Sequence, residues 1–364
     1  MKILFHLGHP AHFHLFKNVI KNLKKNNNDI FILIKKKDVL EDLLKKSNFL
    51  FSNILPDGRK DNIIGIAFGQ VFQVFRMILF CIKRKPEILI GTSVVISFVG
   101  KLLGIPSVNI NEDDAEIVPL YAKLAYPMAS VILVPKGCST GKWQNKTINY
   151  LSYHELAYLH PNQFTPQKKV VQKYFNPDNK YFIIRFAKLT AHHDKGARGI
   201  NKIIASKIIK LLKSRGKVFI TSERQLEPEF EKYRININPS DIHDVMAFAS
   251  IYIGDSQTMA AEAGILGVPF IRFNDFVGKI SYLDELENKY QLGHGIKTNE
   301  VNKLIETLKK LLDQKNCNKF FQERRMSMLK EKIDYAKFLT WFIENYPKSS
   351  KIMNDNPEYQ SKFI

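Results

Sequence analysis

The sequence predicts an α/β protein with two doubly wound, Rossmann-like domains that face a cleft. Short apolar runs alternate with helical stretches between residues 3 and 134, which is typical of a parallel sheet covered by helices. A mixed polar segment over 150–179, with three prolines, interrupts this alternation, and the pattern restarts at Tyr181. A chain of 364 residues is long enough for two domains with full cores.

The first half has the apolar runs and amphipathic stretches of one such domain. The predicted strands are Ile3–Leu7, Ile30–Ile34, Ile88–Ile90, Ser107–Ile110 and Val131–Val134. The predicted helices are Phe13–Lys25, Asp38–Lys46, Ile63–Lys83, Val94–Leu103 and Val118–Leu124. We expect this N-terminal domain to occupy residues 1–160.

The second half repeats the alternation. The predicted strands are Tyr181–Phe186, Lys217–Thr221, Ile251–Ile253 and Val268–Ile271, and the helices are Gly199–Lys213, Ile242–Ala249 and Gln257–Leu266. From Val301 onward the pattern is helical. We expect a C-terminal domain over residues 161–335 and a helical tail over 336–364 that packs back on the N-terminal domain.

The composition indicates a folded protein of the cytoplasm. The hydrophobic fraction is 45%, and the three cysteines, Cys81, Cys138 and Cys317, match no metal-binding spacing and no disulfide framework. The first residues begin a strand, and His6 and His9 interrupt any apolar signal region. We expect a cytoplasmic location, which includes the inner face of the cell membrane.

The net charge of +20 has two explanations. It can serve an anionic partner, namely nucleic acid, a membrane surface or a charged substrate, or it can reflect the lysine-rich composition of a protein from an AT-rich genome. No basic stripe is interleaved with aromatic residues and no nucleic-acid-binding motif is present, so we expect no nucleic acid partner.

The stretch Ile63–Ile82 is apolar but is not a predicted membrane span, because Gln70, Gln73 and Arg76 interrupt it. It is followed by Lys83-Arg84-Lys85. One interpretation is an amphipathic helix packed against the sheet. The other is a helix on the inner leaflet whose basic end contacts anionic headgroups.

The most informative segment is the strand, turn, helix and strand between Tyr252 and Arg272. Asp255 and Ser256 form the turn, and a helix start here presents free N–H groups and a positive end, as phosphate sites do. Glu262, further along the helix, is at a suitable distance for ribose hydroxyls. The alternative is an ordinary βαβ unit with Glu262 in solvent.

The loop after the first strand is rich in histidine. His9, His12 and His14 lie where a substrate can reach them, and histidine commonly removes a proton from a sugar hydroxyl near neutral pH. Helix capping or local packing is the alternative role. We expect no metal, because residues two apart on a helix do not share a face and no cysteine or carboxylate completes a ligand set.

Two further loops follow predicted strands. Glu112, with two aspartates behind it, follows Ser107–Ile110, either as a favourable helix-start charge or as a general base. Arg185 ends Tyr181–Phe186, and the basic loop behind it contains His192. Such a loop attracts a diphosphate when it faces a cleft, and is otherwise a solvated charged loop.

These loops together resemble known families. Gly254-Asp-Ser-Gln-Thr-Met-Ala-Ala-Glu-Ala263, which leads into Leu266-Gly-Val-Pro269, resembles the nucleotide-binding motif of the UDP-N-acetylglucosamine 2-epimerases, and Leu189–Asp194 resembles a loop of that family. Pro10–Lys17 resembles an uncharacterised bacterial and archaeal family with the glycosyltransferase GT-B fold. It is also similar to the first loop of the peptidoglycan N-acetylglucosaminyltransferase.

The resemblance implies a GT-B fold and assigns roles to the motif. Ser256 and the N–H groups of Gln257 and Thr258 hold the diphosphate, and Glu262 holds the ribose. Two departures point away from 2-epimerisation. The first loop has histidines where the epimerases have an arginine. The loop starting at Gly91 has no carboxylate where the epimerases have an aspartate. Glu112 matches one acidic position of that family.

We therefore expect a metal-independent GT-B glycosyltransferase that transfers a sugar from a nucleotide-sugar, a UDP-sugar, to an acceptor in surface polysaccharide or glycolipid synthesis. His12 is the expected base, with His14 or Glu112 as substitutes. The expected donor-binding residues are Arg185, His192, Asp255, Ser256, Gln257, Thr258 and Glu262. The expected partners are this donor, a lipid-linked or saccharide acceptor and an anionic membrane, with no separate cofactor. A UDP-N-acetylglucosamine 2-epimerase-like epimerase or hydrolase is the alternative.

Overall fold

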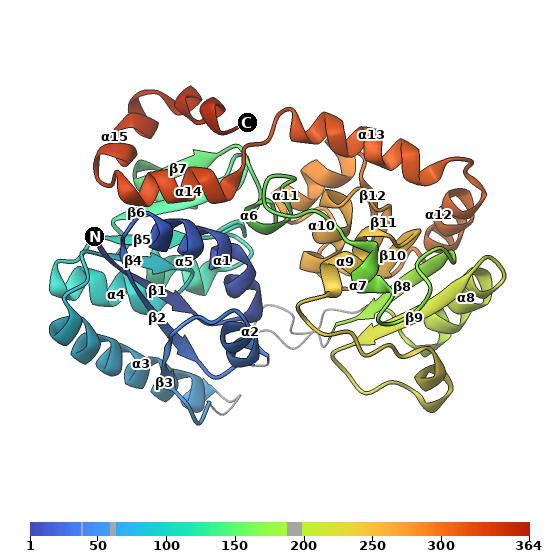
Figure 1. Cartoon of the computed structure of the whole chain (residues 1–364), viewed down its shortest axis with the longest axis horizontal. Coiled ribbons are helices and arrows are strands. Elements are labelled where there is room, and N and C mark those ends of the chain that lie inside the picture. Colours follow the sequence, from blue (N-terminus) through green and yellow to red (C-terminus); the bar gives the residue numbers. More distant parts are fainter. Residues whose placement is uncertain (38, 59–62, 188–198) are drawn as a thin grey trace. The chain divides into compact units, whose positions relative to one another are not determined.

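The computed structural model describes residues 1–37, 39–58, 63–187 and 199–364. The chain forms two compact units (Figure 1). Unit 1 comprises Met1–Gln163 and Lys332–Ile364, and unit 2 comprises Phe164–Glu331. The C-terminal segment thus belongs to the same unit as the N-terminal strands.

Unit 1 is built on a seven-stranded sheet with the order β3-β2-β1-β4-β5-β6-β7. All neighbouring strands are parallel. The strands are β1 (Lys2–Leu7), β2 (Asp29–Lys35), β3 (Ser52–Leu55), β4 (Ile88–Gly91), β5 (Ser107–Ile110), β6 (Val131–Pro135) and β7 (Thr147–Tyr150). The order reverses between β1 and β4, and ligands bind outside the carboxyl ends of the strands at such a switch point.

The helices of unit 1 form two groups. They are α1 (Pro10–Lys25), α2 (Leu40–Lys46), α3 (Ile63–Arg84), α4 (Val94–Leu103), α5 (Pro119–Ala125), α6 (Leu156–Leu159), α14 (Tyr335–Glu344) and α15 (Lys348–Asp355). Helix α1 packs against α2, α6 and α14, whereas α4 packs against α3 and α5. Right-handed crossovers that leave the switch point in opposite directions place α1 and α4 on opposite faces of the sheet.

The C-terminal helix α14 is attached to α1 by side chains as well as by packing. Asn22 Nδ2 donates to the hydroxyl of Thr340 at 3.4 Å, and Asn26 Nδ2 donates to Glu344 at 2.9 Å. Near the chain end, Gln360 accepts a hydrogen bond of 2.6 Å from the N–H of Leu151. These contacts tie the last helices to the first domain's own helix and sheet.

Unit 2 is a five-stranded parallel sheet with the order β12-β11-β10-β8-β9. The strands are β8 (Tyr181–Phe186), β9 (Lys217–Ser222), β10 (Ile251–Gly254), β11 (Phe270–Phe273) and β12 (Gly293–Ile296). The helices are α7 (Lys168–Val171), α8 (Lys202–Lys213), α9 (Ile242–Ala247), α10 (Gln257–Ile265), α11 (Ser281–Asp284), α12 (Val301–Asp313) and α13 (Cys317–Leu329). Here the order reverses between β8 and β10.

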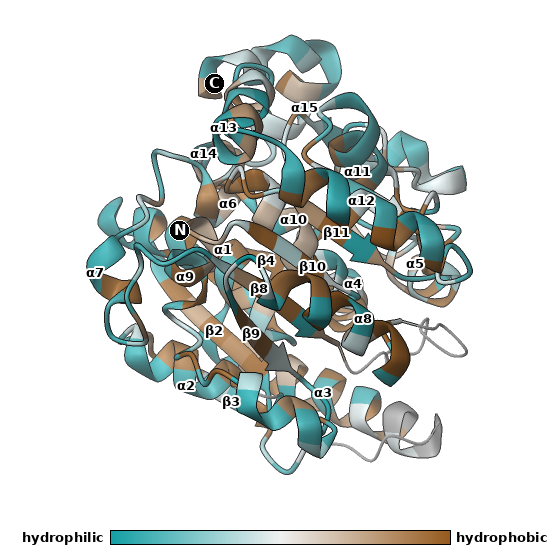
Figure 2. Ribbon diagram, turned by 90° about the vertical axis from the view of Figure 1, so that its right-hand side faces the viewer, coloured by the Kyte–Doolittle hydropathy of each residue, from teal (hydrophilic) through white to brown (hydrophobic). Residues whose placement is uncertain are grey.

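Each unit has its own core, and the strands that form the two sheets are predominantly hydrophobic (Figure 2). Phe182 and Ile253 are fully buried in unit 2, and Leu4 and Leu89 are fully buried in unit 1. The predicted α/β class with two Rossmann-like domains is confirmed.

Three strands were not predicted: β3, β7 and β12. All three lie at the edge of a sheet. An edge strand is covered on fewer sides, so its sequence need not be a continuous apolar run, and these four-residue strands contain Ser52, Asn149 and His294. The predicted start of the second helix, Asp38, lies outside the described residues.

Candidate functional site

The switch point of unit 2 collects most of the predicted donor-binding residues. Arg185, near the end of β8, is paired in register with Gly254, the last residue of β10. Asp255 and Ser256 follow directly. These residues therefore lie at the carboxyl edge of two adjacent strands, where doubly wound sheets bind their ligands.

Helix α10 begins at this edge with a side-chain cap. Ser256 is the N-cap residue, and its Oγ accepts a hydrogen bond of 3.4 Å from the N–H of Met259. The N–H groups of Gln257 and Thr258 stand outside the intrahelical pattern, because the first turn of a helix has no preceding carbonyls to bond. Two N–H donors and the positive helix end thus point toward the switch point.

Asp255 holds the two ends of the neighbouring loop. Its carboxylate is buried and accepts hydrogen bonds from the N–H of Ala187 at 2.6 Å and from that of Ile200 at 3.2 Å. Burial raises the pKa of Asp255 to about 6. A side chain at Gly199 would collide with this carboxylate. Asp255 thus shapes the site, while His192 belongs to the segment 188–198 and lies outside the described residues.

The guanidinium of Arg185 is paired with the carboxylate of Glu223, just beyond the end of β9. The Arg185 side chain is mostly buried and that of Glu223 is half exposed. A phosphate at the switch point would meet this guanidinium, and its binding would compete with an exposed carboxylate rather than with a buried one.

Glu262 lies one turn and a half into α10 and is buried. Its Oε1 is 3.0 Å from Nε2 of His243, which belongs to α9. Only about a twentieth of the residue's surface is exposed. The structure therefore joins Glu262 to a histidine for which the sequence indicated no chemistry.

A buried polar network braces the turn before α10. Asn274 Nδ2 donates to the carbonyl oxygen of Asp255 at 3.1 Å, and Asn274 Oδ1 accepts from Arg272 at 3.3 Å. Arg272, fully buried, donates twice to Glu287, at 2.7 and 3.1 Å. An ion pair with two hydrogen bonds fixes the orientation of the Arg272 guanidinium as well as its distance from Glu287.

In unit 1 the switch point between β1 and β4 holds His12. Its Nδ1 accepts from the N–H of Gly8 at 3.1 Å, and its Nε2 lies 2.7 Å from Oγ1 of Thr92. Because a backbone N–H can only donate, Nδ1 carries a lone pair and Nε2 carries the proton of the neutral ring. Burial, reinforced by nearby His9 and Lys35, holds the pKa of His12 well below 6.5. His12 is therefore neutral at pH 7.

Two helices begin beside His12. His9 caps α1, accepting from the N–H of Ala11 at 3.2 Å, and Ser93 caps α4. Ser93 Oγ is also 2.7 Å from Nδ1 of His6, a buried histidine whose pKa burial lowers to about 3. The positive ends of α1 and α4 thus converge near His12 and favour an anion there.

His14 does not share the surroundings of His12. Its ring contacts those of Phe13 and Tyr158, and its Nδ1 is 3.5 Å from Nζ of Lys17. Tyr158 lies on α6, whereas Thr92 follows β4. The two histidines thus face different neighbours, as two residues on one helix separated by two positions must.

Glu112, after β5, forms a pair that was not predicted. Its Oε2 is 3.0 Å from Nδ1 of His154, which follows β7. The imidazole of His154 is stacked parallel to the rings of Tyr150 and Tyr335, with centroids 6.4 and 6.0 Å away. A carboxylate beside one imidazole nitrogen orients the ring, while the other nitrogen, Nε2, is buried and has no hydrogen-bond partner among the described residues.

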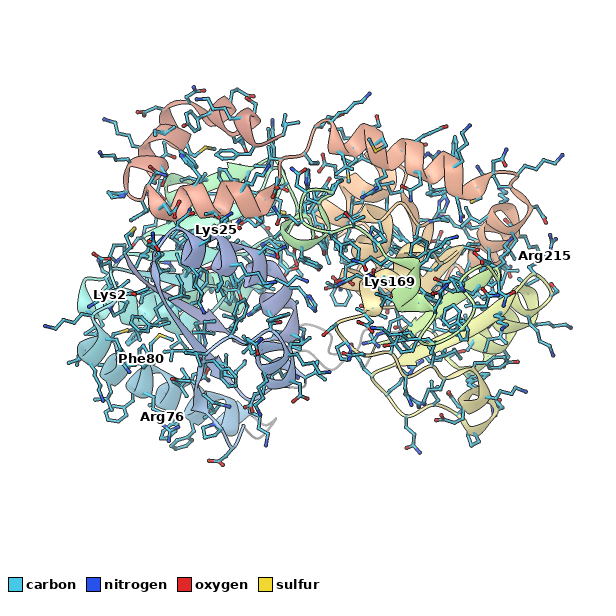
Figure 3. All side chains as sticks on the ribbon, in the orientation of Figure 1. Lys2, Lys25, Arg76, Phe80, Lys169 and Arg215 are labelled. Atoms are coloured by element: carbon cyan, nitrogen blue, oxygen red, sulfur yellow. The ribbon has the colours of Figure 1, made fainter. Side chains whose placement is uncertain are left out.

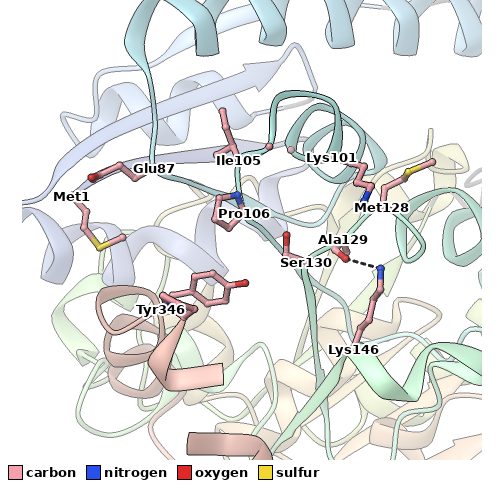
Figure 4. A pocket seen from close by; sticks show the side chains of 13 residues that line it. Met1, Glu87, Lys101, Ile105, Pro106, Met128, Ala129, Ser130, Lys146 and Tyr346 are labelled. Carbon is pink, nitrogen blue, oxygen red and sulfur yellow. Dashed lines mark hydrogen bonds between the residues drawn. The ribbon is translucent and has the colours of Figure 1, made fainter. Parts of the chain in front are cut away.

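A pocket of about 670 Å³ lies at the opposite, amino edge of the unit 1 sheet (Figure 4). Its lining includes the residues just before five strands, namely Met1, Glu87, Pro106, Ser130 and Lys146. Lys146 donates to the carbonyls of Pro127 and Ala129. None of the predicted site residues lines this pocket.

Within the part of the chain that the structure describes, no three His, Cys, Asp or Glu side chains are close enough together to hold a metal ion.

The comparisons with known proteins agree with this architecture. The model of the family described as "Protein of unknown function (DUF354)" matches residues 1–337. The chain belongs to this family. No curated protein matches it by sequence.

Solved structures share the fold of this DUF354 member at low sequence identity. The UDP-GlcNAc 2-epimerase from Neisseria meningitidis, bound to UDP-GlcNAc, has a TM-score of 0.65 and 16% identity, covering 94% of this chain and 99% of the other. The 2-epimerase from Methanocaldococcus jannaschii, in complex with UDP-GlcNAc and UDP, has a TM-score of 0.63 and 15% identity. The match covers 86% of this chain and 94% of the other. The spinosyn forosaminyltransferase SpnP has a TM-score of 0.64 and 13% identity. The match covers 95% of this chain and 100% of the other. The predicted relationship to 2-epimerases and GT-B glycosyltransferases is confirmed at the level of the fold.

Three side chains at these sites of the DUF354 chain were not singled out from its sequence: Thr92, His154 and His243. His154 follows β7, an edge strand, and lies in the segment 150–179 that interrupts the predicted alternation. His243 lies in the loop-to-helix segment before β10. Thr92 and His154 follow the ends of strands, so their signal was position and not a motif, whereas His243 lies in the first turn of α9 and no signal in the sequence marked it.

Proposed function

We propose that this protein is a metal-independent GT-B glycosyltransferase that uses a nucleotide-sugar, a UDP-sugar, as its donor. The observation that carries the proposal is the switch point of unit 2, where Arg185 and the capped start of α10 meet at the ends of adjacent strands. Solved structures of the same fold are complexes with UDP-GlcNAc and UDP. That common fold supports a nucleotide-sugar in this position.

The donor diphosphate would be bound in unit 2 by main-chain N–H donors and a side-chain cation. The N–H groups of Gln257 and Thr258 and the guanidinium of Arg185 supply hydrogen bonds and positive charge. As the bond between the sugar and the diphosphate breaks, negative charge grows on the leaving phosphate, and these donors stabilise it without a metal ion. Glu262, held by His243, is proposed to bind the ribose.

The acceptor would be bound in unit 1. Its hydroxyl oxygen attacks the anomeric carbon of the donor sugar, the carbon–oxygen bond to the diphosphate breaks, and UDP leaves. His12 takes the hydroxyl proton. Because its Nδ1 carries the lone pair, proton transfer requires the hydroxyl to take the place of the Gly8 N–H. A neutral imidazole at pH 7 is in the correct state for this step.

The proposed acceptor class is based on the net charge of the protein, +20. A saccharide or a lipid-linked acceptor in surface polysaccharide or glycolipid synthesis suits a basic protein at the inner face of the membrane. No cofactor beyond the donor is proposed.

The test is a panel of nucleotide-sugars against the full chain in the presence of a chelator. We expect UDP and at least one UDP-sugar to bind in calorimetry, and slow release of UDP that accelerates when an acceptor saccharide or glycolipid is added. A protein that neither binds nor hydrolyses any nucleotide-sugar would contradict the proposal.

A second candidate, epimerisation or hydrolysis of the same donor, is favoured by the pair of Glu112 and His154. An acid–base pair of this kind can remove and return a proton at the sugar ring when the substrate reaches Nε2 of His154, which is buried in this structure. An experiment in deuterated water distinguishes the two reactions. Epimerisation at carbon 2 exchanges that hydrogen with solvent and needs no acceptor, whereas glycosyl transfer leaves it in place.

A further inference from the structure

Helix α3 carries large apolar side chains on its outer face. Phe68, Phe72, Phe75, Leu79 and Ile82 recur at intervals of three or four residues, which places them on one side of a helix. Between 43% and 73% of each of these residues is exposed. For a surface helix, this face would ordinarily be polar.

The opposite side of the same helix is also apolar where it meets unit 1. Met77 and Cys81 are buried in the core together with Leu4 and Leu89 of the sheet. Helix α3 is thus hydrophobic on both sides, although only one side is covered within the unit. A helix that is hydrophobic all round normally has both sides covered.

The apolar surface continues over the two adjacent helices. Phe98 and Leu102 are exposed on α4, and Leu120 and Leu124 are exposed on α5. Helix α4 packs against both α3 and α5. We refer to the outward side chains of α3, α4 and α5 as the α3–α5 face. Contiguous apolar patches of this extent mark interaction sites.

All the charged residues on these three helices are basic. No Asp or Glu occurs in Ile63–Arg84, Val94–Leu103 or Pro119–Ala125. Lys83, Lys101 and Lys123 are exposed, one on each helix. The guanidinium of Arg76, which is labelled in Figure 3, lies 4.2 Å from the ring centroid of Phe72, so a positive charge is next to the aromatic surface. An uncovered apolar face with only positive charges is complementary to a surface that is apolar inside and anionic outside.

We propose that the α3–α5 face docks on the surface of an anionic lipid bilayer. The aromatic and aliphatic side chains enter the boundary between headgroups and acyl chains, while the lysines and arginines contact anionic headgroups. None of the helices that the structure describes has the length and apolarity needed to cross a membrane. The proposed binding is therefore peripheral, and it is independent of the nucleotide site.

The first experiment measures co-sedimentation of the full chain with vesicles, without nucleotide-sugar. Vesicles of phosphatidylcholine are compared with vesicles in which about a third of the lipid is phosphatidylglycerol. We expect binding to the anionic vesicles to be at least about tenfold tighter and to weaken with salt. Equal or absent binding to both would overturn the proposal.

The second experiment removes the apolar contacts. The triple variant Phe72→Ser, Phe75→Ser, Leu79→Ser should lose about tenfold or more in vesicle affinity, because burying these side chains drives insertion. The matched control, Ile203→Ser, Phe320→Ser, Met326→Ser, removes exposed apolar residues from unit 2 and should bind like the wild type. Circular dichroism confirms that both variants are folded. An equal loss in both would overturn the assignment to this face.

The third experiment compares two variants of equal net charge that differ in where lysines are replaced. The variant Lys83→Glu, Lys101→Glu, Lys123→Glu should lose binding to anionic vesicles. The control Lys207→Glu, Lys210→Glu, Lys213→Glu makes the same change on exposed positions of α8 and should retain it. A second copy of the chain is the competing occupant. Light scattering that shows a dimer dispersed by the α3 serine variant, with no vesicle binding by the wild type, would overturn the proposal in favour of that occupant.

Discussion

His243 Nε2 lies 3.0 Å from Oε1 of Glu262 in the interior of unit 2, although the two side chains come from different helices. The sequence motif predicts Glu262 as a ribose ligand, and this contact determines how that carboxylate is held. A carboxylate fixed by a buried imidazole has little rotational freedom to lose on binding. The same contact means that any substitution at Glu262 also affects the stability of unit 2.

Glu262→Ala should weaken UDP binding by about tenfold to a hundredfold, the usual range for losing a hydrogen bond to a charged group. Calorimetry with UDP measures this directly. His243→Ala is the matched control, because it breaks the same buried pair and leaves the carboxylate. If both variants lose affinity only in proportion to their loss of thermal stability, Glu262 is a structural residue and the ribose role is wrong.

His12→Ala should lower kcat by about a hundredfold to ten-thousandfold, the range for a general base, with little change in donor affinity. His14→Ala is the control, since His14 contacts Tyr158 whereas His12 lies 2.7 Å from Thr92. Equal activity of wild type and His12→Ala would exclude His12 as the base.

The pH dependence of catalysis follows from the lowered pKa of His12. A base with a depressed pKa is already deprotonated at pH 6.5, so kcat/KM should stay level at that pH and fall only as the medium becomes more acidic. A pH–rate profile checks this. A midpoint at or above 6.5 would show that another group limits the rate.

The stability of unit 2 should depend on pH through Asp255. Its folded pKa of about 6 lies above the unfolded value of 3.8, so folding favours the protonated form. This protonation contributes about 3 kcal/mol to the free energy of unfolding. The contribution is complete below pH 4 and is lost as the pH rises through 6. Urea unfolding from pH 4 to 7 should show this slope in the wild type and a smaller slope in Asp255→Asn. Identical slopes would contradict the assignment.

The pair of Arg272 and Glu287 should be strongly coupled. Arg272→Met leaves a buried carboxylate without its two hydrogen bonds and should cost about 3–5 kcal/mol. The double variant with Glu287→Leu should recover a large part of that loss, because no buried charge remains. Urea unfolding of the four proteins in the cycle measures the coupling. Additive losses would mean that the pair is not a unit.

The sequence predicts many of the helices and strands of this protein. Alternating apolar runs predicted the central strands, and the turn at Asp255 and Ser256 predicted the start of α10 because helix capping depends on adjacent residues. His12 was predicted in the loop after the first strand, whereas the structure has it in the first turn of α1, which begins at Pro10 and not at Phe13. The roles of these residues in catalysis and donor binding stay predictions.

The sequence by itself determined the α/β class and which segments end at strand edges, since both depend on periodicity over a few residues. Only the tertiary structure decided the strand order, and with it the two switch points at which separate loops meet. It alone joined Glu112 to His154 and Glu262 to His243, and left the outer face of α3 uncovered. These outcomes depend on contacts between residues far apart in the chain, and local periodicity carries no information about such partners.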